Sequence, residues 1–149
     1  MKSIFEINTN NELVDRIKNL NSEAKPLWGK MDASQMLAHT QAPFDVAFGY
    51  LKVKRGILGF LFGGYLRKKL TKDLPFGKNL PTIPEFKKDT PSSFEIEQLK
   101  LIKLVQHVGE KGFSAIKIDT HPFFGKMNSE EWDCLLYKHI DHHLKQFGV

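Results

Sequence analysis

The histidines are the strongest candidates for a functional site in this sequence, because neutral imidazole is a common ligand of divalent metals near pH 7. His139 and His143 are four residues apart, which places both on one side of a helix. A helical wheel puts them on the same face as the apolar Leu136 and Ile140. His39 belongs to a separate helical segment and also falls beside apolar residues. The spacing therefore predicts that all three side chains point into one core.

Buried imidazole nitrogens need partners, because each one left without a hydrogen bond costs about 1–3 kcal/mol. One divalent metal would satisfy all three histidines, and three protein ligands leave a position open for water or substrate, as in catalytic sites. The alternative is that each histidine is separately hydrogen-bonded in or near the core. Zinc is the first choice of metal, and nickel, iron and manganese stay open because imidazole suits several of them.

Four long helices have to position these histidines. Capping residues and the helical spacing of apolar residues predict helices near 10–22, 32–52, 93–111 and 128–147. Capping boxes are expected at Thr9–Glu12, Asp32–Gln35 and Ser92–Glu95, with Asn128 capping the last helix. The expected fold is all-α: a four-helix bundle with one extra short helix and a long crossover loop, forming a single domain over residues 1–149.

The segments between the long helices carry weaker signals. Residues 56–66 are apolar and glycine-rich, and they predict a short helix that needs neighbours to hold it. Residues 73–92 contain four prolines and predict the crossover loop. We expect this loop and a helix within 56–70 to border the mouth of the site. Residues 113–120 alternate weakly and could form a short extended piece, which cannot make a sheet alone.

Pro43 stands inside the second predicted helix, four residues after His39. Proline has no N–H group, so the carbonyl of His39 loses its helical partner. Two outcomes stay open. The helix either kinks or widens beside the predicted ligand, or it breaks there.

The composition is ordinary for one globular domain: 149 residues, 41% hydrophobic and 26% charged. The single cysteine, Cys134, excludes an internal disulfide, and the N-terminus has no apolar signal core, so we expect a cytoplasmic protein. Cys134 falls on a different face of the last helix from His139 and His143, which makes it a poor nucleophile candidate.

The net charge of +5 is concentrated around the apolar segment 56–66. A solvated basic face is the expected reading, and a helix lying on a membrane surface is the alternative. Eleven residues are too few to cross a bilayer, so no transmembrane segment is expected. No groove-reading motif is present, so any DNA binding should be weak and without sequence specificity. The basic residues are Lys52, Lys54, Arg55, Arg67, Lys68, Lys69 and Lys72.

The last helix resembles the H-x-x-x-H segment of the DinB-like superfamily, in which a glutamine follows three residues after the second histidine. The matching residues are Tyr137-Lys-His139-Ile-Asp-His142-His143-Leu-Lys-Gln146-Phe147. Further blocks resemble one branch of that superfamily, a domain of unknown function. These are Pro26-Leu-Trp28-Gly-Lys-Met31, Gln35-Met-Leu-Ala-His39 and His121-Pro-Phe-Phe-Gly125, continuing to Glu131-Trp132 and the tail to Val149.

This resemblance implies a four-helix bundle whose metal is held by one histidine of the second helix and two of the last. The matching positions here are His39, His139 and His143. The superfamily includes thiol-dependent transferases and an isomerase, which implies that the metal activates a low-molecular-weight thiol. The general physics agrees, because a thiol coordinated to zinc is deprotonated and becomes a nucleophile.

Six other side chains are candidates for supporting the ligands or lining a pocket. Two glutamines lie within one turn of a predicted ligand and would hydrogen-bond to it. Two aromatic residues would line the pocket, with core packing as the alternative. One histidine occupies the loop before the last helix, where a turn role is the alternative, and another lies at the margin of the inner face. The glutamines are Gln35 and Gln146, and the aromatic residues are Trp28 and Tyr50. The loop histidine is His121 and the marginal histidine is His142, while His107 is expected to be solvated.

Two functions follow from these observations. The first is a metal-dependent enzyme, a transferase that moves a thiol or another nucleophile to a small electrophile. The second is a non-enzymatic bundle that binds a small molecule, a lipid or a protein partner, with residues 56–72 as the contact region. Metal content separates the two. A homodimer is a further expectation, because it is the commonest oligomer.

Overall fold

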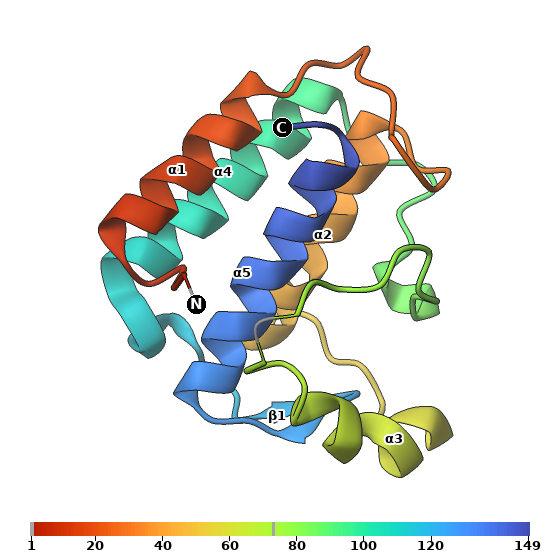
Figure 1. Ribbon diagram of the computed structural model, residues 1–149, viewed down its shortest axis with the longest axis vertical. Coiled ribbons are helices and arrows are strands. Elements are labelled where there is room, and N and C mark those ends of the chain that lie inside the picture. Colours follow the sequence, from red (N-terminus) through yellow and green to blue (C-terminus); the bar gives the residue numbers. More distant parts are fainter. Residues whose placement is uncertain (1, 73) are drawn as a thin grey trace.

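The computed structural model describes residues 2–72 and 74–149 and is predominantly helical, which confirms the all-α prediction (Figure 1). The four long helices are α1 (Ile7–Asn19), α2 (Ala33–Ala47), α4 (Phe94–Lys111) and α5 (Ser129–Gln146). The shorter elements are α3 (Ile57–Arg67), the 3₁₀ turns η1 (Pro84–Phe86) and η2 (Gly112–Ala115), and the strands β1 (Thr120–His121) and β2 (Gly125–Lys126).

The four long helices pack around one apolar core. Helix α1 contacts α4 and α5, and α2 contacts the same two helices. Helix α5 lies in front of α2 in Figure 1, with α1 and α4 beside them. Burying each large apolar side chain contributes about 1.5–3 kcal/mol, so the core supplies the main stabilising term. Its largest fully buried members include Trp132, Phe44, Ile4, Met36, Leu101, Leu136 and Ile140.

The two helices that carry the predicted ligands begin where the sequence predicts. The Asp32 carboxylate accepts from the Gln35 backbone N–H at 2.8 Å, and the Gln35 side chain accepts from the Asp32 N–H at 3.0 Å. Asn128 and Glu131 make the same reciprocal pair at the start of α5, at 2.9 Å each. Both capping boxes are therefore confirmed, and they fix where the helical register of each ligand begins.

The other two predicted capping boxes are wrong. Helix α1 begins at Ile7, so Thr9 is a buried residue inside the helix and not its cap. Ser93 precedes α4 without a side-chain cap, and the Ser92 N–H instead donates to the Glu97 carboxylate at 3.1 Å. At Thr9 the pattern fails because the helix already begins two residues earlier, so the backbone N–H groups after Thr9 have helical partners.

Helix α2 ends at Ala47, five residues before the predicted end at 52. Gly49 adopts a positive φ of 77°, and the Tyr50 N–H turns back to the Asp45 carbonyl at 2.8 Å. This is the Schellman arrangement, which satisfies the last carbonyls of a helix and favours glycine. Residues 33–47 form one continuous helix that includes Pro43, so the alternative of a break at the proline is wrong.

The segment after α4 differs from the expectation of a single extended piece. It begins with the turn η2, and its end pairs with a second strand, Thr120 opposite Lys126 and His121 opposite Gly125. The predicted turn at residues 121–125 is the tip of this small antiparallel hairpin. Helix α3 packs against the hairpin at the lower end of Figure 1. Among the described residues, no helix combines the length and apolar character needed to cross a membrane.

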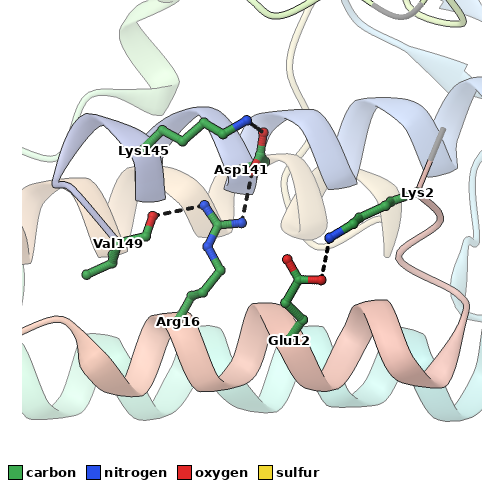
Figure 2. A network of polar contacts seen from close by, with 6 residues as sticks. All are labelled: Lys2, Glu12, Arg16, Asp141, Lys145 and Val149. Carbon is green, nitrogen blue, oxygen red and sulfur yellow. Dashed lines mark hydrogen bonds and ion pairs between the residues drawn. The ribbon is translucent and has the colours of Figure 1, made fainter.

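A polar network on the outer side of α5 joins it to α1 (Figure 2). Arg16 donates to the Asp141 carboxylate and to the Val149 carbonyl, both at 2.9 Å. Lys145 binds the second oxygen of the same carboxylate at 2.7 Å. Asp141 lies between His139 and His143 in sequence, so tying it to α1 holds the opposite side of α5 toward α2.

Candidate metal centre

The three predicted ligands converge between α2 and α5. His39 comes from the middle of α2, and His139 and His143 come from successive turns of α5. One potential donor atom from each lies within 4.8 Å of the other two. The Nε2 atoms of His39 and His139 are 3.2 Å apart. Two zinc ligands at about 2.0–2.1 Å in a tetrahedron are roughly 3.3 Å from each other, so this pair already has the spacing that zinc requires.

The protonation of His39 is set by a backbone carbonyl. Its Nδ1 lies 2.9 Å from the Phe86 oxygen, and a carbonyl can only accept, so Nδ1 carries the proton. The neutral ring then presents an unprotonated Nε2 to the cluster. A hydrogen bond at the far nitrogen is the usual way in which proteins orient a metal-binding imidazole.

The protonation of His143 follows from a longer chain of bonds. The Trp28 carbonyl accepts from Gln146 Nε2 at 2.6 Å, which fixes which end of the Gln146 amide is the donor. Gln146 Oε1 therefore faces His143 Nδ1 at 2.8 Å and accepts a hydrogen bond from the Nδ1–H group. His143, like His39, is left with an unprotonated Nε2. Gln146 therefore bonds to His143 as expected from its position one turn away, and its support of a metal ligand stays a prediction.

His139 completes the group from the centre of the cluster. Its Nδ1 is buried and has no hydrogen-bond partner among the described residues. Its ring centroid lies 5.0 Å from that of His39 and 4.7 Å from that of His143. In this structure His139 Nε2 lies within hydrogen-bond distance of the unprotonated His39 Nε2, and its Nδ1 is left without a partner. The three rings form a donor set that could hold a metal ion in place of that contact, and the three histidines fit one.

The electrostatics favour neutral imidazole throughout. Burial lowers the pKa of His143 to about 3, with the neighbouring His39 as the next cause. Burial and the adjacent His143 and His39 hold the pKa of His139 well below its ordinary value. Burial also lowers the pKa of His39, although its bond to the Phe86 carbonyl acts in the opposite direction. Neutral rings are the form that coordinates metal, so the cluster is ready to bind near pH 7.

One side of the cluster is lined by aromatic rings and a lysine. His142 packs against Trp28 with ring centroids 5.6 Å apart, and against Phe76 at 6.2 Å. Lys78 places its ammonium 4.3 Å from the centre of the Trp28 ring. Phe76 and Lys78 belong to the proline-rich loop, as does Phe86. The position of the loop therefore agrees with the prediction that it borders the site. The other part of that prediction, a border formed by a helix within 56–70, differs from the structure, because α3 packs against the hairpin.

Comparison with known proteins gives one match. The model of a family described as "Protein of unknown function (DUF1569)" matches residues 2–148. The chain belongs to the DUF1569 family. No curated protein and no solved structure matches it significantly. The family match covers both helices that carry the histidines, so the cluster lies wholly within the DUF1569 domain.

The remaining predicted residues of this DUF1569 chain take other positions. Tyr50 is 78% exposed and lies against Phe48, on a surface pocket of about 450 Å³ between α2 and α4 that also includes His107. Gln35 completes the α2 cap and is 3.4 Å from the Asp89 carbonyl. Tyr50 therefore does not line the centre, because the chain turns away at Gly49. Gln35 instead forms part of the capping box at the start of α2.

His121 has a structural role that the sequence left open. Its Nδ1 accepts from the Phe123 and Phe124 backbone N–H groups at 3.1 and 3.3 Å, which closes the hairpin turn. Its ring is buried against Trp132. His121 is thus a turn residue. Cys134 is buried, and burial raises the pKa of its thiol, which agrees with its prediction as a poor nucleophile.

Sequence reasoning missed the contribution of the loop residues. Phe86 acts through a carbonyl that every residue has, so no side-chain pattern could have identified it. Phe76 and Lys78 are separated from every predicted ligand by more than 35 positions in sequence, about the length of a whole supersecondary unit. The proline content of 73–92 predicted a loop, but only the fold shows which of its residues reach the histidines.

Proposed function

We propose that this DUF1569 protein is a metal-dependent enzyme of the DinB-like kind, which transfers a low-molecular-weight thiol or another nucleophile to a small electrophile. The observation that carries the proposal is the convergence of His39, His139 and His143, with two Nε2 atoms 3.2 Å apart. Three histidine ligands leave at least one coordination position for water or substrate, which is typical of catalytic and not structural zinc.

The arrangement of the helices supports the same proposal. Helices α1 and α2 each pack against both α4 and α5, and a long connection with the short helix α3 joins α2 to α4. A four-helix bundle with one long crossover has this connectivity, and such bundles carry metal sites on facing helices of their core. The histidines occupy the facing positions of α2 and α5.

A bound zinc ion would supply a Lewis acid that lowers the pKa of a coordinated thiol or water. The chain itself would fix the ligands. Phe86 and Gln146 hold two imidazoles in the tautomer that presents Nε2, so little reorganisation is needed on binding. The wall formed by Trp28 and His142 would limit the access of bulk water from that side.

Elemental analysis tests the metal directly. Protein purified without chelator is expected to carry close to one equivalent of a divalent metal, with zinc as the first expectation. His39→Ala and His143→Ala should each lose this metal, and His107→Ala is the matched control because His107 is an exposed histidine on α4. Wild-type protein that takes up no metal when dialysed against zinc, although folded, would contradict the proposal.

The transfer reaction needs a separate test. The metal-loaded protein should accelerate the reaction of a small thiol with an electrophile such as an activated aromatic halide or epoxide. The metal-free protein and His143→Ala should not. Tight metal binding without turnover of any thiol or water nucleophile would keep the metal centre but reject the transferase in favour of a non-enzymatic binding bundle.

A further inference from the structure

Helix α3 turns its small residues toward the protein and its large apolar residues outward. A Cβ added at Gly63 would lie 1.9 Å from the Phe123 carbonyl oxygen, and one at Gly59 would lie 3.0 Å from Phe123 Cα. These glycines, four residues apart, let the helix backbone rest directly on the hairpin. At these two positions α3 presents only hydrogen atoms to the hairpin, and at its end Arg67 reaches inward to pair with Glu131 at 3.3 Å.

The opposite side of α3 is apolar and exposed. Taking Gly59 as zero on a helical wheel, Phe60, Ile57, Leu61 and Tyr65 fall between about 100° and 240°. They are 71%, 79%, 61% and 63% exposed. Phe62, near 300°, is also exposed, and Leu66, near 340° beside the two glycines, is 37% exposed. An apolar face of this kind on an otherwise folded chain marks a contact with another apolar phase.

The charge around this face identifies the kind of partner. Between residues 46 and 72 the sequence has seven basic residues and no Asp or Glu. Three precede α3 or lie at its start (Lys52, Lys54 and Arg55), and four lie at its end or just after it (Arg67, Lys68, Lys69 and Lys72). Lys69 extends over the Tyr65 ring, with its ammonium 4.5 Å from the ring centre. Long basic side chains beside apolar rings are suited to an interface between an apolar phase and an anionic surface.

We propose that the outward face of α3 binds the surface of an anionic lipid bilayer, with Ile57, Phe60, Leu61 and Tyr65 entering the acyl boundary. The lysines at both ends of the helix would bind the lipid phosphates, since Arg67 is already paired with Glu131 at 3.3 Å and Arg55 donates to the Gly59 carbonyl at 3.1 Å. A helix with an apolar outer face and a cationic rim lies in the plane of the membrane and does not cross it. This proposal is independent of the metal centre.

Charge also argues against a second copy of this chain as the occupant. In a two-fold dimer the same patch faces itself, so two basic rims would be brought together without acidic residues from this segment to offset them. Like charges placed opposite each other across an interface disfavour binding. An anionic partner removes this repulsion, and a flat, fluid bilayer suits a convex helix face.

A vesicle flotation assay tests the proposal with the full chain. The wild-type protein should float with vesicles made of equal parts phosphatidylglycerol and phosphatidylcholine, and much less with phosphatidylcholine alone. The double variant F60S/L61S should bind the anionic vesicles at least tenfold more weakly. The matched control is L80S/L99S, because Leu80 and Leu99 are exposed leucines outside α3. All four substituted positions are exposed, so the fold should survive, as circular dichroism would verify.

The charge contribution is tested by K68Q/K69Q against K103Q/K111Q, two exposed lysines of α4. The first pair should weaken vesicle binding several-fold more than the second. The proposal is overturned if the wild-type protein ignores anionic vesicles, or if F60S/L61S binds them as well as L80S/L99S does. It is equally overturned if F60S/L61S abolishes a dimer seen by sedimentation while vesicle binding is absent, because α3 would then be a self-association surface.

Discussion

Replacing Gln146 with leucine should separate ligand orientation from ligand identity. Gln146 is not one of the three proposed metal ligands, but it accepts from His143 Nδ1 at 2.8 Å and donates to the Trp28 carbonyl at 2.6 Å. Gln146→Leu keeps a side chain of similar size and removes both bonds. His143 would lose the acceptor that selects its tautomer, while all three ligands stay in the sequence.

The expected loss can be worked from these contacts. Removing a hydrogen-bond partner of a metal ligand typically costs about 10–100-fold in metal affinity, which is about 1.4–2.7 kcal/mol. The fold should lose stability as well, because the buried His143 Nδ1 is left unpaired at about 1–3 kcal/mol, less what the leucine gains by burial, while the part-buried Trp28 carbonyl adds less. In a chain of this size each kcal/mol lowers Tm by about 2–4 °C.

The assay is a zinc titration in competition with a chromophoric chelator, run at a temperature where every variant is folded. Gln106→Leu is the control, since Gln106 is an exposed glutamine of α4. Gln146→Glu should fall between wild type and Gln146→Leu, because a carboxylate still accepts from His143 but cannot donate to the Trp28 carbonyl. An unchanged zinc Kd in Gln146→Leu, with Tm lowered as expected, would show that Gln146 supports only the fold.

Three further predictions concern stability and the hairpin. Burial lowers the pKa of His121 from 6.5 to about 4, so the unfolded chain binds more protons between these values, and stability should fall by about 3 kcal/mol as pH drops from 6.5 to 4. His121→Asn, which keeps an acceptor for the turn, should flatten that part of a urea-unfolding pH profile, and an unchanged slope would refute the assignment. Gly63→Ala should push α3 off the hairpin and increase tryptic cleavage near Lys68. Gly64→Ala is the control and should not increase cleavage, because its added Cβ meets nothing within 4 Å. Equal cleavage of the two variants would contradict the contact between α3 and the hairpin. The Asn10 amide donates to two carbonyls at 3.0 and 2.7 Å and lies 2.6 Å from where a Gly109 Cβ would be. Gly109→Ala should therefore cost less stability in an Asn10→Ala background than in the wild type. An additive double-mutant cycle in thermal unfolding would refute this packing.

The parts of the fold that follow local rules could be predicted from the sequence. Asp32 and Asn128 cap their helices through bonds to residues three positions away, so a short window contains the whole interaction. The i,i+4 spacing of His139 and His143 likewise depends only on helix geometry. Thr9 has an equally good capping pattern, but the helix begins two residues before it, at Ile7.

The parts that depend on distant backbone could not be predicted. The hairpin strands are two residues each, too short for an alternating pattern to show. The end of α2 was overestimated because apolar residues continue past Gly49, although the glycine itself was the available stop signal. The prediction that Tyr50 lines the pocket depends on the helix reaching residue 52, and it fails because the chain turns at Gly49.

The bond from His39 to the Phe86 carbonyl has a consequence for how this family can vary. Any residue at position 86 supplies a carbonyl, so substitution there leaves the orienting group in place as long as the backbone path is kept. An insertion or deletion in the turn Pro84–Phe86 would instead move that oxygen away from Nδ1. Surface loops usually tolerate changes of length. Among relatives that keep the three histidines, the length of this turn should therefore be conserved more strictly than the identity of its exposed residues, while position 86 stays apolar because the Phe86 side chain is buried.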